Sequence, residues 1–497
     1  MACLQSVYAA ADAETDESMP SDAAFLRDIA RRAMIARGLE PDFPPGAEAA
    51  AASMAPEDAS GIQDLTALPW SSIDNDESKD LDQAEVVIRE GASFRVLVAI
   101  ADVAGLVPRH TPIDDHAQTN TTSVYTPAEI FPMLPPELST GTTSLNHDAE
   151  RDAVVIEVRV DEAGHRVDER VYAARVKNQA KLAYNAVAGW LDGGPAPDPL
   201  RRSDIAEQVR LQDRIAALLQ ARRDEEGALE FDRAELTPVM DGDRVTRLDT
   251  ERTNRAREII ENFMVAANGV TARFLGRNNV ASLRRIVRAP ERWSRIVALA
   301  AQHGARLPPE ADAAALSAFL KQRRAESPDT FADISLAVLK LLGRGEYVAS
   351  TPGAPTEHFA LAVSSYTHST APNRRFPDLI AQRQIKAVLT GTPPPYDLST
   401  LTALAAHCTQ REDDANKIER LVKKAAAALL LRSHIGETFD GIVTGASPKG
   451  TWVRIAHPMV EGRVERGEQG LDVGDRVRVR LISTEPAKGF IDFAAQH

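Results

Sequence analysis

The sequence predicts a large mixed α/β domain, preceded by a short helical segment and followed by a small all-β barrel. Apolar residues alternate with a strand-like period of two between residues 86 and 175, and recur with a helical period between residues 205 and 342. Five short strand patterns separated by turn residues follow residue 437. The proline-rich stretch at residues 391–397 lies between the two regions and resembles a linker.

The composition is that of an acidic globular protein. The chain has 497 residues, of which 43% are hydrophobic and 26% charged, with a formal net charge of −14. Two cysteines, Cys3 and Cys408, are too few for a disulfide framework or a thiolate zinc site, which indicates a reducing cytoplasm. Neither a basic leader nor an apolar run of ~20 residues is visible, so we expect a cytoplasmic protein without membrane contact. The charge disfavours a protein that coats nucleic acid, but allows an enzyme with a locally basic channel.

Residues 1–60 are expected to form a helical appendage. Ser21 can cap a helix and Gly38 can end it. Phe25, Ile29 and Ala33 fall on one face of that helix. An alanine-rich stretch follows as a second candidate helix. The segment is too short for a complete β-barrel.

Residues 61–395 are expected to form one mixed α/β domain. Val86–Arg89 and Phe94–Val103 have the pattern of a hairpin, as do Ala153–Val160 and Arg166–Arg175. Helical patterns then follow at Ile205–Arg223, Ala256–Leu275, Arg292–Gln302, Ala313–Ala325 and Phe331–Leu342.

A connecting helix is expected within residues 396–433, before a barrel at residues 434–497. Five strands of this length suit a small Greek-key barrel of the OB type. Trp452 and Arg454 could form an aromatic and basic face for single-stranded nucleic acid. The alternative is that Trp452 belongs to the barrel core. The predicted strands are Thr438–Thr444, Thr451–Ile455, Val460–Val464, Arg476–Leu481 and Phe490–Phe493.

The stretch from Asp74 to Asp82 places five acids in nine positions. Like charges this close repel one another in a poorly solvated site, and divalent cations relieve that repulsion. Hard oxygen ligands suit magnesium, manganese or calcium. Asp80 and Asp82 lie two residues apart in an extended chain, so they project to the same side, and a short loop can bring Asp74 back to them. The stretch therefore predicts a carboxylate metal site for phosphoester chemistry; the alternative is an acidic surface loop.

The same loop also has the spacing of an EF-hand calcium loop. Its ligand positions would run from Asp74 to Glu85. However, the position that requires glycine is Lys79, Pro69 lies in the approach, and a strand-like sequence follows where a helix should begin. We therefore disfavour a calcium sensor.

The motif made by Ser72–Asp74 and Lys79–Gln83 resembles the first motif of the ribonuclease II (RNB) family of 3′-to-5′ exoribonucleases. Four further blocks are similar to motifs of this family and follow in its order: residues 97–103, then 122–125 with 131–135, 137–139 and 144–146, then 258–268, and finally 366–378. The resemblance covers about residues 61–390 and extends to the barrel. It implies a magnesium-dependent hydrolase, with manganese as an alternative ion, that degrades single-stranded RNA processively from the 3′ end to nucleoside 5′-monophosphates. It implies no small-molecule cofactor and says nothing of protein partners.

The resemblance also implies roles at the reaction centre. Asp82, Arg374 and Tyr184 are the expected catalytic residues. Asp82 would be indispensable, Arg374 would meet the scissile phosphate, and Tyr184 would lie near the 3′-terminal nucleotide. The alternative for Arg374 is a surface ion pair. The implied metal ligands are Asp74, Asp80, Asp82 and Gln83.

Further residues are expected to bind RNA. Tyr125 and Phe231 match aromatic residues that stack the terminal bases, which suits an enzyme that accepts every base. Glu261 would bond ribose hydroxyls, and His368 would orient a phosphate. Trp452 and Arg374 complete this set. The alternatives are that the two aromatic residues belong to the core, that Glu261 is an exposed acid on a helix surface, and that His368 has only a structural role.

The sequence departs from the family pattern at several points. Gln83 stands where a fourth aspartate is common, which removes one negative charge. Ala371 and Asn373 replace a usual serine and isoleucine. Residues 1–60 leave no room for the usual pair of N-terminal cold-shock barrels, so we expect less demand for a long single-stranded tail. The rival hypothesis is an RNB-like protein that binds RNA without cleaving it, and Gln83 is the residue that favours it.

Overall fold

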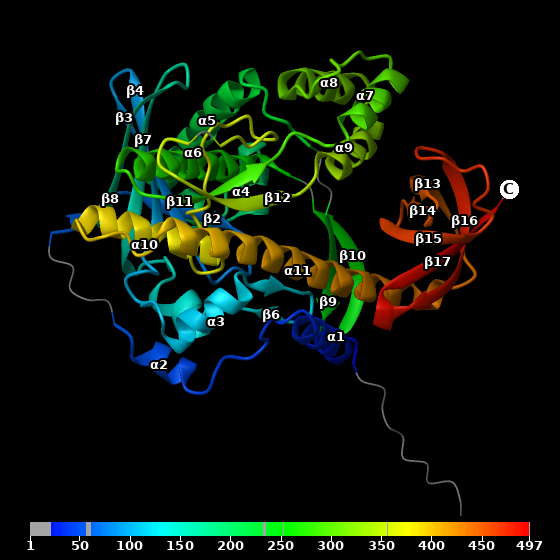
Figure 1. Cartoon of the computed structure of the whole chain (residues 1–497), viewed down its shortest axis with the longest axis horizontal. Coiled ribbons are helices and arrows are strands. Elements are labelled where there is room, and N and C mark those ends of the chain that lie inside the picture. The colour runs from blue at the N-terminus through cyan, green and yellow to red at the C-terminus, as the bar shows by residue number, and fades with distance from the viewer. Residues whose placement is uncertain (1–20, 56–60, 232–234, 252, 355, 497) are drawn as a thin grey trace, which may run out of the picture.

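A six-stranded sheet lies at the centre of the large domain in the computed structural model of the chain (Figure 1). The structure describes residues 21–55, 61–231, 235–251, 253–354 and 356–496. The strand order is β1-β8-β2-β3-β4-β7, and β7 also pairs with β8, so that the sheet curls back on itself. The bounds are β1 (Gln63–Asp64), β2 (Trp70–Asp74), β3 (Gln83–Glu90), β4 (Ser93–Ala101), β7 (Glu150–Asp161) and β8 (Arg166–Ala183).

The two faces of this sheet are packed against different helices. Successive side chains of a strand point to opposite faces. Along β4, Val96 and Val98 join a core with residues of α5 and α6, whereas Leu97 and Ala99 join a core with residues of α3 and α10. Both faces are therefore buried, which explains the nearly continuous apolar run in β4. The helices are α3 (Pro112–Asn120), α4 (Tyr184–Leu191), α5 (Ser203–Glu225), α6 (Arg255–Arg277) and α10 (Phe376–Thr390).

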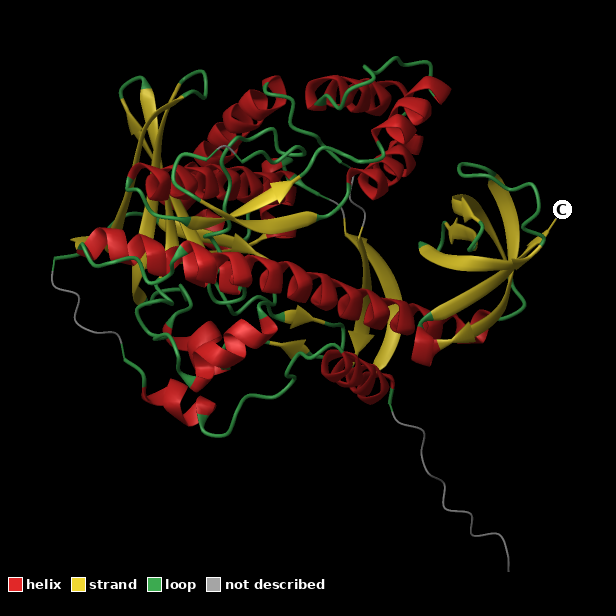
Figure 2. Ribbon diagram, in the orientation of Figure 1, coloured by secondary structure: helices red, strands yellow, loops and turns green. Residues whose placement is uncertain are grey.

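Three further helices form a lobe with its own hydrophobic core. Ile296, Leu316 and Val338 are buried between α7 (Trp293–Gln302), α8 (Ala313–Glu326) and α9 (Pro328–Leu342). In Figure 2 this all-helical lobe stands apart from the sheet.

The large domain also contains shorter elements. They are a π-helix (Glu137–Thr142), a 3₁₀ turn (Asp198–Arg201) and the strand pairs β5 (Val124–Tyr125) with β6 (Ile130–Phe131), β9 (Glu235–Asp241) with β10 (Arg244–Glu251), and β11 (Ser282–Val287) with β12 (Gly345–Ser350).

The described part of the N-terminal segment, residues 21–55, contains two helices, as predicted. Helix α1 (Asp22–Ala36) begins after Ser21, whose Oγ accepts a hydrogen bond from the backbone N–H of Ala24 at 3.2 Å. Leu26 and Met34 are fully buried in a core shared with α11 and with the β5–β6 pair. A short second helix, α2 (Ala47–Ser53), follows. Cys3 lies outside the described residues.

Helix α11 (Leu398–Leu431) connects the large domain to the barrel (Figure 1). Its 34 residues correspond to a length of about 50 Å. Leu401 and Leu404 near its start are buried in the core of the large domain. Ala428 and Leu431 at its end are buried in the core of the barrel. One helix thus belongs to both cores.

The C-terminal barrel is closed and has five strands in the order β13-β14-β15-β17-β16. Only β15 and β17 pair in parallel, which is the topology of an OB fold. Val453, Val464 and Phe493 are buried inside it. The predicted OB barrel is therefore confirmed. The bounds are β13 (Thr438–Ser447), β14 (Gly450–Ile455), β15 (Val460–Arg466), β16 (Arg476–Glu485) and β17 (Phe490–Gln496), with 3₁₀ turns at Arg432–His434 and Pro486–Lys488.

All the predicted helices and strands are present, but several elements were missed. Helix α10 was missed because nearly all of its side chains are buried, including Gln382, Arg383 and Gln384, so it lacks an amphipathic pattern. Helices α3 and α4 and the strands β9 to β12 are short and also escaped prediction. Across the described ranges, no helix combines the length and apolarity needed to cross a membrane.

Candidate active site

The acidic stretch forms the loop between β2 and β3. Strand β2 ends at Asp74 and β3 begins at Gln83, so strands rather than helices flank the loop, and the EF-hand alternative is wrong. Ser144 holds the loop in place: its Oγ accepts a hydrogen bond from Leu81 N at 2.9 Å and donates one to Lys79 O at 2.8 Å. The loop is therefore anchored from the segment that follows the π-helix.

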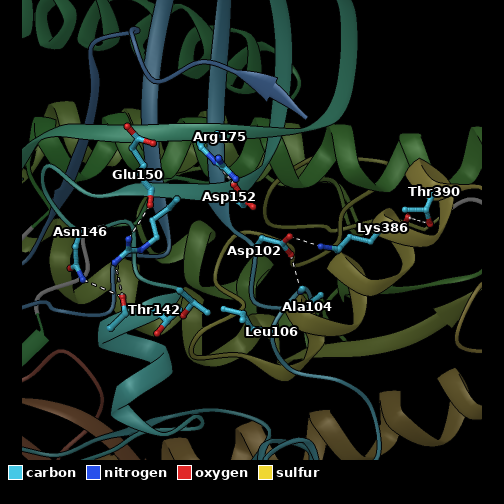
Figure 3. A pocket seen from close by; sticks show the side chains of 14 residues that line it. Asp102, Ala104, Leu106, Thr142, Asn146, Glu150, Asp152, Arg175, Lys386 and Thr390 are labelled. Atoms are coloured by element: carbon cyan, nitrogen blue, oxygen red, sulfur yellow. Dashed lines mark hydrogen bonds and ion pairs between the residues drawn. The ribbon is translucent and has the colours of Figure 1, made fainter. Parts of the chain in front are cut away.

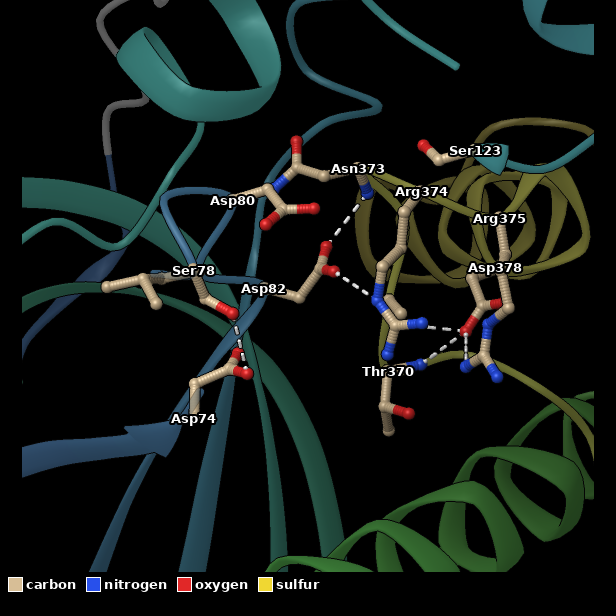
Figure 4. A network of polar contacts seen from close by, with 12 residues as sticks. Asp74, Ser78, Asp80, Asp82, Ser123, Thr370, Asn373, Arg374, Arg375 and Asp378 are labelled. Carbon is tan, nitrogen blue, oxygen red and sulfur yellow. Dashed lines mark hydrogen bonds and ion pairs between the residues drawn. The ribbon is translucent and has the colours of Figure 1, made fainter. Parts of the chain in front are cut away.

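Asp82 lies at the buried end of this loop (Figure 4). Its side chain is 1% exposed, and Oδ1 accepts a hydrogen bond from the backbone N–H of Asn373 at 2.8 Å. Oδ2 lies 3.3 Å from Nε of Arg374 and has no hydrogen-bond donor among the described residues. Burial raises the pKa of Asp82 to about 7, although the Arg374 charge and the Asn373 N–H both oppose this rise.

Asp74 and Asp80 lie near Asp82, but each is turned toward its own donor. Asp74 Oδ1 accepts from Ser78 Oγ at 2.9 Å and from Asn75 N at 2.7 Å, and burial raises the pKa of Asp74. Asp80 Oδ2 accepts from the hydroxyl of Tyr125 at 2.9 Å. Within the described part of the chain, no three acidic, histidine or cysteine side chains form a metal-binding group. In this structure Asp74 and Asp80 are thus each held by a separate donor.

Glu85 is a buried acid that the sequence analysis did not assign to this site. It is 0% exposed, and neither carboxylate oxygen has a hydrogen-bond partner in the described structure. Burial, followed by the charge of Asp74, holds the pKa of Glu85 well above its usual range. Gln83 lies two residues before it on β3 and is also buried. An acid inside a strand pattern is the sequence signal that could have drawn attention to Glu85.

The segment before α10 presents Arg374 to the acids. Asp378 is 0% exposed and accepts hydrogen bonds from the backbone N–H groups of Thr370 at 2.8 Å and Ala371 at 2.9 Å. It also accepts from Nη2 of Arg375 at 2.7 Å. These bonds fold the segment into a compact turn at the start of the helix (Figure 4). The side chain of Arg374 remains 42% exposed, so it can contact a ligand beside Asp82.

Two tyrosines flank the acidic loop. Tyr125 is bonded to Asp80, as described above, and its backbone N–H donates to Glu419 of α11 at 2.9 Å. Tyr184 begins α4, directly after Ala183, the β8 residue that pairs with Asp74. Burial and the charges of Asp74 and Glu85 raise the pKa of Tyr184, so its hydroxyl stays protonated.

Arg257 also reaches this side of the site, although it was not predicted. Its guanidinium lies over the Tyr184 ring, 4.6 Å from the centroid. Its Nη2 donates to Asn75 Oδ1 at 3.1 Å. Arg257 lies one residue before the glutamate motif on α6, so its position beside that motif was the available signal.

The other predicted residues make contacts of their own. Glu261 is exposed on α6, where Nη2 of Arg223 lies 3.6 Å away. Phe231 packs at the edge of the α7–α9 lobe. His368 Nδ1 is hydrogen-bonded to Tyr347 Oη at 2.8 Å, and burial holds the pKa of His368 well below its usual range, so the ring is neutral. Trp452 lies on the outer side of β14 and is not part of the barrel core.

A cavity of about 940 Å³ lies between the end of β4, the start of β7 and α10 (Figure 3). Its charges are largely paired: Lys386 with Asp102, and Arg175 with Asp152 at 2.9 Å. None of the predicted metal ligands lines this cavity. It is therefore separate from the acidic site.

Comparison with known proteins assigns the family. The model of the RNB domain matches residues 62–391, and the model of the RNase II-type exonuclease C-terminal S1 domain matches residues 437–496. The chain belongs to the RNB family. The suspected relationship is thereby confirmed, and the OB barrel is an S1 domain.

Curated RNB relatives are ribonucleases R. The chain is 30% identical over 484 residues to Ribonuclease R of Escherichia coli, covering 88% of this chain and 58% of the relative. It is 27% identical over 454 residues to Ribonuclease R 1 of Lactococcus lactis, covering 85% of this chain and 55% of the relative. The chain thus spans less than two thirds of the length of these relatives.

Solved RNB structures share the fold. Mycoplasma genitalium RNase R in complex with ribose methylated single-stranded RNA matches with a TM-score of 0.87 at 23% identity, covering 95% of this chain and 78% of that chain. Yeast Ssd1, described as a pseudonuclease, matches with a TM-score of 0.68 at 17% identity, covering 93% of this chain and 58% of that one. At these identities the matches show the fold alone.

Two departures from the RNB pattern leave the geometry intact. The backbone N–H of Ala371 donates to Asp378 and that of Asn373 donates to Asp82. Any residue other than proline provides such an N–H. The Asn373 side chain contacts Thr143, whose Oγ1 donates to Oδ1 at 2.6 Å. Only Gln83 changes the charge of the acidic site.

The donor set of this RNB site fits a hard divalent cation. Its side chains offer oxygen atoms only, the kind of ligand that magnesium and manganese prefer. Asp82 Oδ2 is buried without a hydrogen bond, so it has a free lone pair for such an ion.

Proposed function

We propose that this RNB protein is a divalent-metal-dependent exoribonuclease. It hydrolyses single-stranded RNA processively in the 3′-to-5′ direction and releases nucleoside 5′-monophosphates. The observation that supports this function best is the contact between buried Asp82 and half-exposed Arg374 inside an RNB domain. The pair combines an acid that can hold a cation with a guanidinium that can bind a phosphate.

Asp74, Asp80, Asp82 and Gln83 would hold magnesium, or manganese in its place. A bound ion of this kind supplies Lewis acidity, which polarises the phosphodiester and makes water a stronger acid. The protein contributes the positioning: Ser144 fixes the loop, and Asn373 N fixes the Asp82 carboxylate.

Arg374 would bind the scissile phosphate and the negative charge that develops on it. Its planar guanidinium suits phosphate oxygens, and it is always charged. Because the Asp378 bonds fix the backbone around it, Arg374 is already oriented before RNA binds. Tyr184, held under the Arg257 guanidinium, would contact the 3′-terminal nucleotide from the other side.

RNA would reach this centre along the barrel side of the molecule. Trp452 on the outer side of the S1 barrel would stack a base, and Tyr125 and Phe231 would stack bases nearer the acids. Glu261 would bond ribose hydroxyls and His368 would orient a phosphate. Mycoplasma genitalium RNase R has been solved with single-stranded RNA and with double-stranded RNA, which supports RNA as the ligand of this fold.

The test follows an RNA oligonucleotide labelled at its 5′ end, with purified protein and magnesium. A ladder that shortens from the 3′ end, with a matched DNA spared, is expected. Asp82→Asn should abolish shortening. Asp76→Asn is the matched control, because the same change is made in the same loop at an exposed side chain. Shortening that survives in Asp82→Asn would contradict the proposed role of this acid.

The rival function is RNA binding without cleavage. Gln83 suggests it, whereas the retained Asp74, Asp80, Asp82 and Arg374 argue more strongly for catalysis. Tight RNA binding with no shortening in magnesium or manganese would establish the rival.

A further inference from the structure

The cavity between β4, β7 and α10 has no role in the proposed reaction, yet it has the size of a ligand site. Its volume of about 940 Å³ lies within the usual range for small-molecule pockets, roughly 300–1,000 Å³. Polar side chains line it from opposite sides: Figure 3 shows Asp102 and Lys386 on one side, and Thr142 and Asn146 on the other. The cavity therefore suits a polar ligand about as large as a nucleotide.

Arg151, the second residue of β7, brings a positive charge to this cavity that no acid of the described structure pairs. The other two cations of the lining are paired with acids, as described above. The guanidinium of Arg151 donates instead to three backbone oxygens, those of Ser144 at 3.1 Å, Gly141 at 3.2 Å and Glu150 at 2.9 Å. The carboxylate of Glu150 is exposed at the rim and forms no ion pair with it among the described residues.

This arrangement of Arg151 suits a phosphate group. A guanidinium has five N–H donors, and the three backbone bonds leave one donor on each terminal nitrogen. Two donors on one planar group can bind two oxygens of a phosphate, and the bonds are strengthened by the charges. The backbone bonds also fix the guanidinium in advance, so a ligand need not order it. The exposed carboxylate of Glu150 can accept hydrogen bonds from hydroxyl groups of the same ligand.

Two hydrogen-bonded paths connect the lining of the cavity with the acidic site. In the first, Thr143 donates from Oγ1 to Asn373 Oδ1 at 2.6 Å, and the backbone N–H of Asn373 holds Asp82 at 2.8 Å. In the second, Arg151 holds the backbone oxygen of Ser144, whose side chain anchors the acidic loop. A ligand in the cavity would therefore contact the residues that support the acidic site.

We propose that this cavity binds a nucleoside 5′-monophosphate, with its phosphate on Arg151 and its ribose hydroxyls toward Glu150, and that the bound nucleotide slows RNA cleavage. The choice of nucleotide rests on the proposed function, because nucleoside 5′-monophosphates are the products of that reaction. Accumulated product would thus restrain the enzyme from a second site, through the residues that support the acidic loop.

The test measures AMP binding to the full chain by titration calorimetry, in EDTA and without RNA. Arg374→Ala removes the phosphate contact at the acidic loop, so AMP that still binds to this variant reports the cavity. Adding Arg151→Gln should raise the AMP dissociation constant about tenfold or more, because charge-assisted hydrogen bonds are lost. Arg151→Lys keeps the charge and should lose less. Arg159→Gln is the matched control, since the same change is made on the same strand outside the cavity, and it should have no effect.

A second variant blocks the cavity and keeps all the bonds of Arg151. Ala104 lines the cavity, and its backbone N–H donates to Gln382, a bond that does not depend on the side chain. Ala104→Phe should therefore abolish AMP binding to the cavity, and RNA shortening by this variant should no longer be slowed by excess AMP. Inorganic phosphate and adenosine, tested separately, should each bind at least about tenfold more weakly than AMP. Thermal unfolding checks that each variant is folded.

The outcomes separate this site from the proposed nuclease. AMP binding that is lost in Arg374→Ala but intact in Arg151→Gln would lie at the acidic loop and would overturn the inference. Inorganic phosphate that binds as tightly as AMP would overturn the choice of a nucleotide. AMP binding that requires Arg151, in a chain that never shortens RNA, would refute the nuclease and keep the site. RNA shortening without any AMP binding to Arg374→Ala would refute the site and keep the nuclease.

Discussion

The hydroxyl of Tyr125 donates a hydrogen bond to Oδ2 of Asp80 at 2.9 Å, so an aromatic side chain proposed to stack a base also holds a proposed metal ligand. Tyr125→Phe keeps the ring and removes this bond. We expect the magnesium concentration at half-maximal activity to rise several-fold, while the length of the shortest product stays the same. Tyr125→Ala should in addition lengthen that product, because the stacking surface is lost. Equal effects of both variants would contradict a separate role for the hydroxyl.

Arg374 should act on the chemical step more than on RNA binding. Arg374→Lys keeps the positive charge but loses the planar fork of donors. We expect kcat to fall by about 10²–10³, the range found when one donor to a developing anion is removed. The RNA dissociation constant, measured in EDTA, should change less than about threefold, because single phosphate contacts contribute little to total affinity. A large loss of RNA affinity with unchanged kcat would argue for a binding role.

Asp378 should be a major contributor to stability. From the first turn of α10, it accepts two backbone N–H bonds from the preceding segment and pairs with Arg375. Removing one partner of a buried ion pair costs about 3–5 kcal/mol. Asp378→Ala is therefore expected to lower the free energy of unfolding by about this amount in urea titrations. Asp397→Ala, which removes the exposed cap of α11, is the control and should cost about 1 kcal/mol.

Because of His358, we expect the protein to lose stability in mild acid. Burial, with a contribution from Arg285, lowers its pKa to about 4 in the folded chain, against about 6.5 when unfolded. The unfolded state therefore binds the proton first, and stability present above pH 6.5 is lost as the pH falls toward 4. The loss is at most about 3 kcal/mol. Thermal unfolding between pH 7 and pH 4.5 should show a smaller decrease for His358→Gln than for the wild type.

Trp452 should contribute to RNA affinity without contributing to the barrel core. Trp452→Ala is expected to weaken RNA binding by about 1–3 kcal/mol, the usual value for one stacked base. The melting temperature should stay near that of the wild type, because Trp452 lies on the outer side of β14. Val453→Ala provides the contrast: its side chain is fully buried, so stability should fall while RNA affinity is kept.

The sequence alone predicted those features that depend on local pattern. The amphipathic helix α5 and the alternating strand β14 were predicted, because solvent on one side leaves a period in the sequence. Helix α10 leaves no such period, since both polar and apolar residues of it are buried. The motif around Asp82 and Arg374 identified the family, and the two residues are in contact.

The finer arrangement of the site depends on contacts between distant residues. The sequence could not show that Asp80 is bonded to Tyr125, or that the N–H of residue 373 holds Asp82, because tertiary packing sets both distances. His368 matches the arginine motif, yet its ring lies edge-on against the rings of the buried Tyr347 and Tyr366. The burial of Glu85 could not be predicted from the sequence either, because it depends on the packing of α5 over β3.

Helix α11 has a further consequence for substrates. Its two ends are embedded in separate cores, so one continuous helix sets the separation between the barrel that carries Trp452 and the domain that carries Asp82. An RNA that contacts both Trp452 and Asp82 must be long enough to reach from the barrel to the acidic site, and α11 determines that length. Under the proposed function, fragments too short to bridge that span would contact one end only and would dissociate before another nucleotide is removed. We therefore expect that lengthening or shortening α11 would change the size of the shortest product.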